Sequence, residues 1–87
     1  MKKITMFLLP HCPYCRQALA WEAELAAENE AYGTVEIERI DESAQAELAA
    51  TYDYYYVPTY YADGVKLHEG AATKDKIRHV LDEAMRV

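Results

Sequence analysis

Both cysteines of the chain lie in one segment, His11-Cys12-Pro13-Tyr14-Cys15. An apolar stretch that predicts a buried strand precedes this segment, and a run that predicts a helix follows it. The first turn of a helix has unpaired N–H groups and a partial positive charge, and both favour a thiolate at Cys12. Because the thiolate is the attacking species in disulfide exchange, the spacing predicts a redox-active dithiol.

The two cysteines are expected to have different roles. Cys12 lies at the start of the helix, so we expect it to be the exposed nucleophile. Cys15 lies one turn deeper, and we expect it to remain a thiol until it resolves a mixed disulfide. A purely structural disulfide is the alternative, but closing so short a loop stabilises a fold by only about 2 kcal/mol. The redox role is therefore favoured.

A metal site is a further interpretation of the cysteine pair. Structural zinc requires four ligands, and the chain has no second C-x-x-C. His11, His68 and His79 would have to converge on the cysteines to complete such a site. We therefore expect no metal and no bound cofactor.

Length and charge narrow the class of protein. A chain of 87 residues that is 52% hydrophobic predicts one domain over residues 1–87. Its net charge of −6 argues against a nucleic-acid partner, which would require a basic face. No stretch is long enough to span a membrane, and the apolar run after Lys2-Lys3 is too short for a secretory signal. We expect a monomeric cytoplasmic domain.

The hydrophobic pattern predicts seven elements in the order βαβαββα. Strands are expected at 4–8, 34–40, 57–62 and 65–68. Pro13 should begin the first helix, Asp41 or Ser43 should cap a short second helix, and Thr73 should cap the last. The first βαβ unit implies a parallel pair, and the Asp63-Gly64 turn implies an antiparallel hairpin. The expected fold is α/β, with a four-stranded mixed sheet flanked by three helices.

The first and last predicted helices each have an apolar stripe. In the first helix, the glutamates are expected to face solvent. The stripes consist of Ala18, Trp21, Leu25 and Ala26 in the first helix and of Ile77, Val80, Leu81 and Ala84 in the last. The second, shorter helix is expected to run through Ala44, Leu48 and Tyr52.

Taken together, the element order, the C-x-x-C motif and the step Val57-Pro58-Thr59 resemble the thioredoxin fold over essentially the whole chain. The motif Cys12-Pro13-Tyr14-Cys15, followed by Arg16, is similar to that of dithiol glutaredoxins. The second half, with its Asp63-Gly64 hairpin, Gly70 and the segment 71–77, looks more like thioredoxin itself.

The sequence also departs from both families. Leu9 and Pro10 stand where glutaredoxins usually have a basic residue that helps to hold glutathione, and Gly70-Ala71 replaces their Gly-Gly step. Met6 stands where thioredoxins usually have a buried acid. The electron donor therefore stays open between glutathione, favoured by the motif, and a thioredoxin reductase, favoured by the second half.

The resemblance implies a substrate site around Cys12. In this superfamily the proline equivalent to Pro58 is cis and lies beside the cysteines, which frees the backbone of Val57 to pair with a substrate strand. Tyr14 is expected on the rim, His11 is expected to modulate the thiolate, and Arg16 to add positive charge. The tyrosines at 52, 54, 55, 56, 60 and 61 are expected mainly to pack against strands. Because Tyr54 to Tyr56 precede the docking proline, an amphipathic wall for a peptide or thiol is the alternative for these three.

Two functions from different classes fit these residues. The first is a dithiol–disulfide oxidoreductase of glutaredoxin type that reduces protein or small-molecule disulfides. The second is a binding module without turnover, or a carrier of a metal or iron–sulfur cluster held by the C-x-x-C. In glutaredoxin relatives, a proline after the first cysteine disfavours the cluster, so the first function leads.

Overall fold

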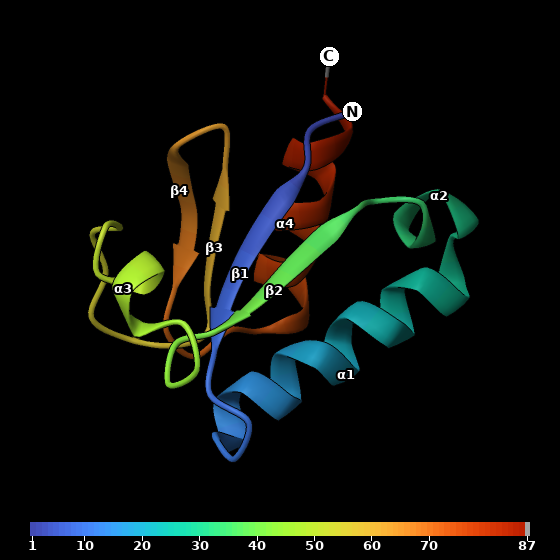
Figure 1. The fold of residues 1–87 in the computed structure, drawn as a ribbon. Helices are drawn as coiled ribbons and strands as arrows, with labels where there is room; N and C mark the ends of the chain where they lie inside the picture. Colours follow the sequence, from blue (N-terminus) through green and yellow to red (C-terminus); the bar gives the residue numbers. More distant parts are fainter. Residues whose placement is uncertain (87) are drawn as a thin grey trace.

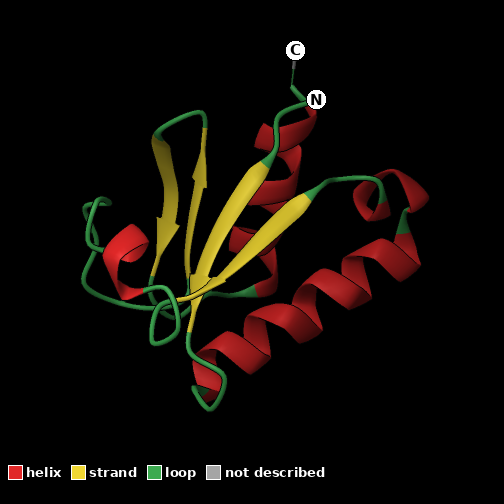
Figure 2. Cartoon of the chain, viewed as in Figure 1, coloured by secondary structure: helices red, strands yellow, loops and turns green. Residues whose placement is uncertain are grey.

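The computed structural model describes residues 1–86 and contains one four-stranded sheet in the order β2-β1-β3-β4. Figure 1 shows the chain from N- to C-terminus, and Figure 2 shows the yellow sheet between the helices. The strands are β1 (Ile4–Leu8), β2 (Ile37–Asp41), β3 (Thr59–Ala62) and β4 (Val65–Glu69). The helices are α1 (Pro13–Glu28), α2 (Glu30–Gly33), α3 (Ala46–Ala49) and α4 (Lys74–Met85).

The strand directions confirm the expected mixed sheet. β1 pairs with β2 in parallel and with β3 antiparallel, and β3 pairs with β4 antiparallel. The β3–β4 hairpin turns at Asp63 and Gly64, whose φ angles of 50° and 79° are both positive. Such angles suit Asp-Gly in a tight hairpin. The α/β fold class is therefore as predicted, with α2 as a fourth, one-turn helix that the sequence did not indicate.

The sheet is buried on both faces, because successive side chains of a strand point to opposite sides. α1 and α4 cover one face, while α3 and the tyrosine-rich segment after it cover the other. The first cluster contains Ile4, Met6, Ala18, Leu25, Val35, Tyr60, Ala62, Ile77, Val80, Leu81 and Ala84. The second contains Phe7, Ile40, Ala49 and Tyr61, with Tyr52, Tyr54 and Val57 packed against them.

One expected surface residue is buried. Glu22 of α1 is only 8% exposed, which corrects the prediction that the glutamates of this helix all face solvent. Its carboxylate accepts two hydrogen bonds from Arg39, at 2.7 and 3.3 Å, and one from the Tyr60 hydroxyl at 2.7 Å. A buried carboxylate is tolerated because these partners replace its hydration. The network ties α1 to β2 and β3.

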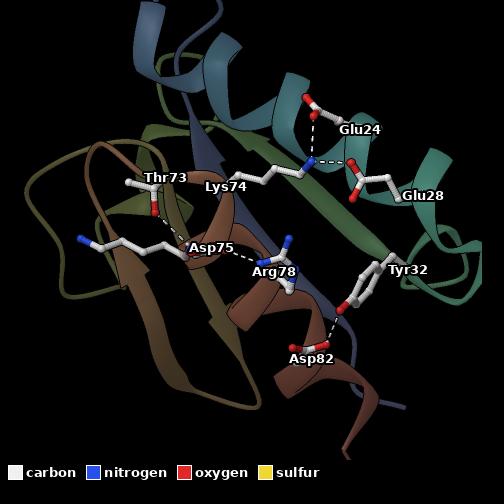
Figure 3. A network of polar contacts seen from close by, with 9 residues as sticks. Glu24, Glu28, Tyr32, Thr73, Lys74, Asp75, Arg78 and Asp82 are labelled. Carbon is white, nitrogen blue, oxygen red and sulfur yellow. Dashed lines mark hydrogen bonds and ion pairs between the residues drawn. The ribbon is translucent and has the colours of Figure 1, made fainter.

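Polar contacts also hold α4 against α1 on the outer face of the molecule (Figure 3). Lys74 donates to Glu24 at 2.7 Å and also bonds Glu28. The Tyr32 hydroxyl donates to Asp82 at 2.7 Å. At the start of α4, the Thr73 side chain accepts from the backbone N–H of Lys76, so the predicted N-cap is confirmed.

The remaining differences concern element boundaries. The second strand begins at Ile37 rather than Thr34, because Asn29 caps the extra turn α2 and Thr34 ends it. The expected helix through Ala44, Leu48 and Tyr52 shrinks to four residues, and Leu48 is 40% exposed. Asp41 Oδ1 accepts from the Ser43 backbone at 2.8 Å, so Asp41 forms a turn instead of capping a helix.

Candidate functional site

The turn between β1 and α1 places Cys12 at the N-cap of the helix. The N–H of Cys12 donates to the Leu9 carbonyl at 3.2 Å, and the Cys12 carbonyl accepts from Arg16 at 3.1 Å, the first bond of the helix. The Cys12 backbone is extended, with φ −80° and ψ 120°, and Pro13 follows at the first helical position. No side chain caps this helix start. The unpaired N–H groups of the first turn therefore face the Cys12 sulfur.

The two thiols differ in exposure as predicted. Cys12 is partly exposed, whereas Cys15 is 1% exposed and forms part of the buried side of α1. Both cysteines are free thiols in this structure, which therefore corresponds to the reduced dithiol. Solvent therefore reaches Cys12 but hardly reaches Cys15.

The surroundings of Cys12 favour its thiolate. Partial burial raises the pKa of Cys12, but four interactions outweigh it and leave this pKa below its ordinary value. They are, in decreasing order, bonds from the Cys15 N–H, the Cys15 thiol and the Tyr14 N–H, and the charge of Arg16. The predicted role of Arg16 as a nearby positive charge agrees with this last contribution.

The surroundings of Cys15 favour its protonated form. Burial is the largest effect and raises the pKa of Cys15 to about 11, even though the Leu9 N–H bonds the sulfur and lowers it. The neighbouring Cys12 and the carboxylate of Glu42 raise this pKa further. As the pH rises, Cys12 therefore loses its proton before Cys15 does.

The sheet brings the Val57-Pro58 step to the same end of the molecule as the cysteines. Phe7 of β1 pairs with Thr59 of β3, so the residues before β3 lie opposite the residues after β1 (Figure 1). The Val57-Pro58 peptide bond is cis, as the family resemblance implied. Within residues 1–86, neither the N–H nor the C=O of Val57 has a hydrogen-bond partner, so both groups are free to pair with another strand.

A cavity of about 480 Å³ opens beside Cys12 and is lined by Leu9, Pro10, His11, Cys12 and Ser43. Of the predicted rim residues, His11 therefore lies in this lining. Tyr14 is 61% exposed on the first turn of α1 and, like the exposed Arg16, lies outside the lining.

Sequence reasoning missed two residues near the thiols. Ser43 lines the cavity beside Cys12, and Glu42 is the carboxylate whose charge acts on Cys15. Glu42 is held in place by the Tyr54 hydroxyl, which donates to it at 2.6 Å. The position of both residues directly after β2 could have indicated this, because β1 and β2 are parallel and their carboxyl ends lie at the same edge of the sheet as the cysteines.

Comparison with known proteins agrees with this geometry. The family described as "Thioredoxin domain" matches residues 2–82. The chain belongs to the thioredoxin-domain family. A probable thioredoxin from Methanothermobacter thermautotrophicus is 29% identical over 82 residues, which cover 94% of each chain.

Solved structures also resemble this thioredoxin-domain chain. An uncharacterized thioredoxin-like protein from Clostridium perfringens is similar with a TM-score of 0.68 at 29% identity, covering 98% of this chain and 71% of the other. A malarial protein shares the fold with a TM-score of 0.72 at 11% identity, covering 99% of both chains.

The thioredoxin-domain structure shows neither a cluster of metal-ligating side chains nor a membrane-spanning helix in residues 1–86. Within residues 1–86, no three His, Cys, Asp or Glu side chains gather closely enough to hold a metal ion. Across the same residues, none of the helices has the length and apolar character needed to cross a bilayer.

Proposed function

We propose that this thioredoxin-domain chain is a thiol–disulfide oxidoreductase that reduces protein or small-molecule disulfides. The observation that carries the proposal is the opposite shift of the two thiols, with the pKa of Cys12 lowered and that of Cys15 raised to about 11. An exposed thiolate followed by a protected thiol is what a nucleophile and a resolving group require. A scaffold that only bound a partner would not need this difference.

The reaction follows from the two sulfur atoms. The Cys12 thiolate attacks one sulfur of a substrate disulfide, forms a mixed disulfide and releases the other substrate sulfur as a thiolate. Cys15 then loses its proton and attacks Cys12, which releases the second substrate thiolate. The Cys12–Cys15 disulfide now holds the oxidation that the substrate has lost, and a two-electron donor reduces it again.

Substrate docking is proposed at the Val57-Pro58 step and around the cavity. The free N–H and C=O of Val57 would pair with an extended substrate segment, a mode that reads backbone and tolerates varied side chains. Tyr14, His11 and Arg16 would contact the substrate from the other side of Cys12. Protein disulfides are therefore the proposed main substrates.

The electron donor is proposed to be either glutathione or a thioredoxin reductase. The Cys-Pro-Tyr-Cys motif supports a glutaredoxin-like use of glutathione, while the family match supports the reductase. Parallel assays with glutathione plus glutathione reductase and with NADPH plus thioredoxin reductase separate them. We further propose that the protein acts as a monomer in the cytoplasm, without bound cofactor, metal or nucleic acid.

Substitution of each cysteine tests the mechanism. Cys12→Ser should abolish turnover of insulin disulfides, because no nucleophile remains at the exposed position. Cys15→Ser should also lose turnover, but should accumulate a mixed disulfide at Cys12 that mass spectrometry detects. Retained turnover in Cys12→Ser would contradict the proposal.

A further inference from the structure

The segment between α3 and β3 contains no helix or strand at residues 53–58, yet its backbone is held at several points (Figure 2). The Glu69 carboxylate, at the end of β4, accepts the N–H of Tyr55 at 2.7 Å and the N–H of Tyr56 at 3.0 Å through the same oxygen, Oε2. Its other oxygen accepts from Lys66 at 2.6 Å. One side chain therefore satisfies two consecutive backbone donors just before Val57.

Three more contacts fix the same segment to the β3–β4 hairpin. The Tyr61 hydroxyl donates to the Asp53 carbonyl and the Thr59 hydroxyl donates to the Tyr56 carbonyl, both at 2.5 Å. At the far end, the Gly70 N–H donates to the Pro58 carbonyl at 2.8 Å. The φ of 87° at Gly70 is in the region that favours glycine. Within residues 1–86, Glu69 is the only one of these side chains that accepts hydrogen bonds from backbone N–H groups in the middle of the segment.

Two tyrosine side chains of this fixed segment are exposed to solvent. Tyr55 is 87% exposed and Tyr56 is 70% exposed. Neither aromatic ring is therefore buried against the rest of the protein. A rigid backbone that presents exposed tyrosines is suited to binding, because the residues contribute large contact areas with little loss of conformational freedom. The two residues directly precede Val57, whose backbone groups are free.

We propose that Glu69 is a positioning residue for substrate docking: it pre-organises Tyr55, Tyr56 and Val57 as a surface for the polypeptide of a protein disulfide substrate. The proposal rests on the function proposed above and adds the residue on which the preference for protein substrates depends. A small disulfide reaches Cys12 without touching residues 55–57, whereas a polypeptide that pairs with Val57 also passes the two tyrosines. Glu69 should therefore matter for proteins and not for small disulfides.

Steady-state kinetics of the full chain with two substrates tests this proposal. With insulin, Glu69→Ala should raise KM about fivefold to tenfold with little change in kcat, because the segment must be ordered during binding. With bis(2-hydroxyethyl) disulfide, both parameters should stay unchanged. Glu69→Gln should recover part of the insulin KM, since its amide oxygen still accepts N–H bonds. Glu83→Ala, which removes a half-buried carboxylate paired with Arg86 at 2.8 Å, is the matched control and should behave as wild type.

Two measurements without turnover complete the test. Hydrogen exchange at the Tyr55 and Tyr56 amides should accelerate in Glu69→Ala, and binding of carboxymethylated insulin B chain, which has no disulfide, should weaken by the same factor as KM rises. Faster exchange with unchanged KM and unchanged binding would overturn the docking role of Glu69. If the wild type bound the B chain but reduced neither disulfide, the oxidoreductase function would fail while the docking surface stood.

Discussion

At the scale of single residues, Cys12 and Cys15 are chemically alike and only their surroundings distinguish them. Cys12 lies at the partly exposed start of a helix, and Cys15, three residues later, lies on the buried side of the same helix. Helix-start N–H groups stabilise a thiolate, and burial disfavours one. The reactivity of the pair is therefore set by position on α1.

Alkylation measured against pH tests this difference. Iodoacetamide should modify Cys12 in the Cys15→Ser variant with a midpoint below that of a free thiol, because the net effect of its surroundings is to lower the pKa of Cys12. In Cys12→Ser, modification of Cys15 should have a higher midpoint, because burial, the largest cause that raises its pKa, remains after the contribution of Cys12 is lost. Equal midpoints for the two variants would contradict the assigned roles.

The position of Cys12 at the start of a helix could be predicted from sequence, since its signal is local: two cysteines, a proline and a helix start within five residues. Glu69 could not. Its backbone partners Tyr55 and Tyr56 lie 14 and 13 residues away, and a glutamate at the end of a strand has no distinctive pattern. Such contacts arise only when the hairpin folds back beside the preceding segment.

At the scale of elements, α1 shows residue type and periodicity in conflict. Its buried positions Cys15, Ala18, Glu22 and Leu25 follow helical spacing, so Glu22 belongs to the buried stripe by position. Its charge suggested solvent instead. The partners that make burial tolerable, Arg39 and Tyr60, come from β2 and β3 and cannot be recognised in the helix sequence.

Two tyrosine substitutions measure what this network contributes. Tyr60→Phe should lower the free energy of unfolding by about 1–3 kcal/mol, because it removes a buried hydrogen bond to a charged acceptor. Tyr32→Phe removes a bond of the same length, 2.7 Å, to the exposed Asp82, and should cost less than about 1 kcal/mol. Urea denaturation gives both values, and equal losses would show that burial of the network adds nothing.

The last helix, α4, was predictable because its apolar residues recur with a helical period, in the buried stripe Ile77, Val80, Leu81 and Ala84. The short helices were not. α2 and α3 each contain four residues, too few for a periodic signal, and only α2 begins with a side-chain cap. Asn29 provides such a cap by accepting from the Ala31 N–H at 3.0 Å.

At the scale of the whole molecule, the shifted pKa values link stability to pH. Bonds from Ser43, Lys66 and Arg86 are the largest causes that lower the pKa values of Asp41, Glu69 and Glu83 respectively. These carboxyl groups stabilise the fold above their unfolded pKa values, and the contribution is lost as the pH falls. For Glu69 the loss extends from about 4.5 to about 2.

The thiol and the lysines act at the other end of the pH scale. Burial raises the pKa of Cys15, and bonds to Glu69 and Glu24 raise those of Lys66 and Lys74. A group whose folded pKa is raised stabilises the fold below its unfolded pKa and loses this effect as the pH rises. The free energy of unfolding should therefore be greatest between the acidic range, where the carboxyl groups titrate, and the alkaline range, where Cys15 and the lysines titrate.

Urea unfolding at pH 7, pH 5 and pH 3 checks the acid limb. The free energy of unfolding should be similar at pH 7 and pH 5 and lower at pH 3, because the unfolded chain then binds more protons than the folded one. In Glu69→Gln the difference between pH 7 and pH 3 should shrink, since the most strongly shifted carboxyl group is gone. Equal stability at pH 7 and pH 3 in the wild type would contradict the linkage.

The first strand also determines where a fusion partner can be attached. β1 runs from the N-terminus towards the cysteines, and the Lys2 N–H donates to the Ala84 carbonyl of α4 at 2.7 Å, so the start of β1 and the last turn of α4 lie at the opposite pole (Figure 1). A fluorescent protein attached before β1 or after α4 would therefore begin far from the Cys12 sulfur. A short peptide joining α4 to β1 would give a circular permutant with that sulfur still accessible.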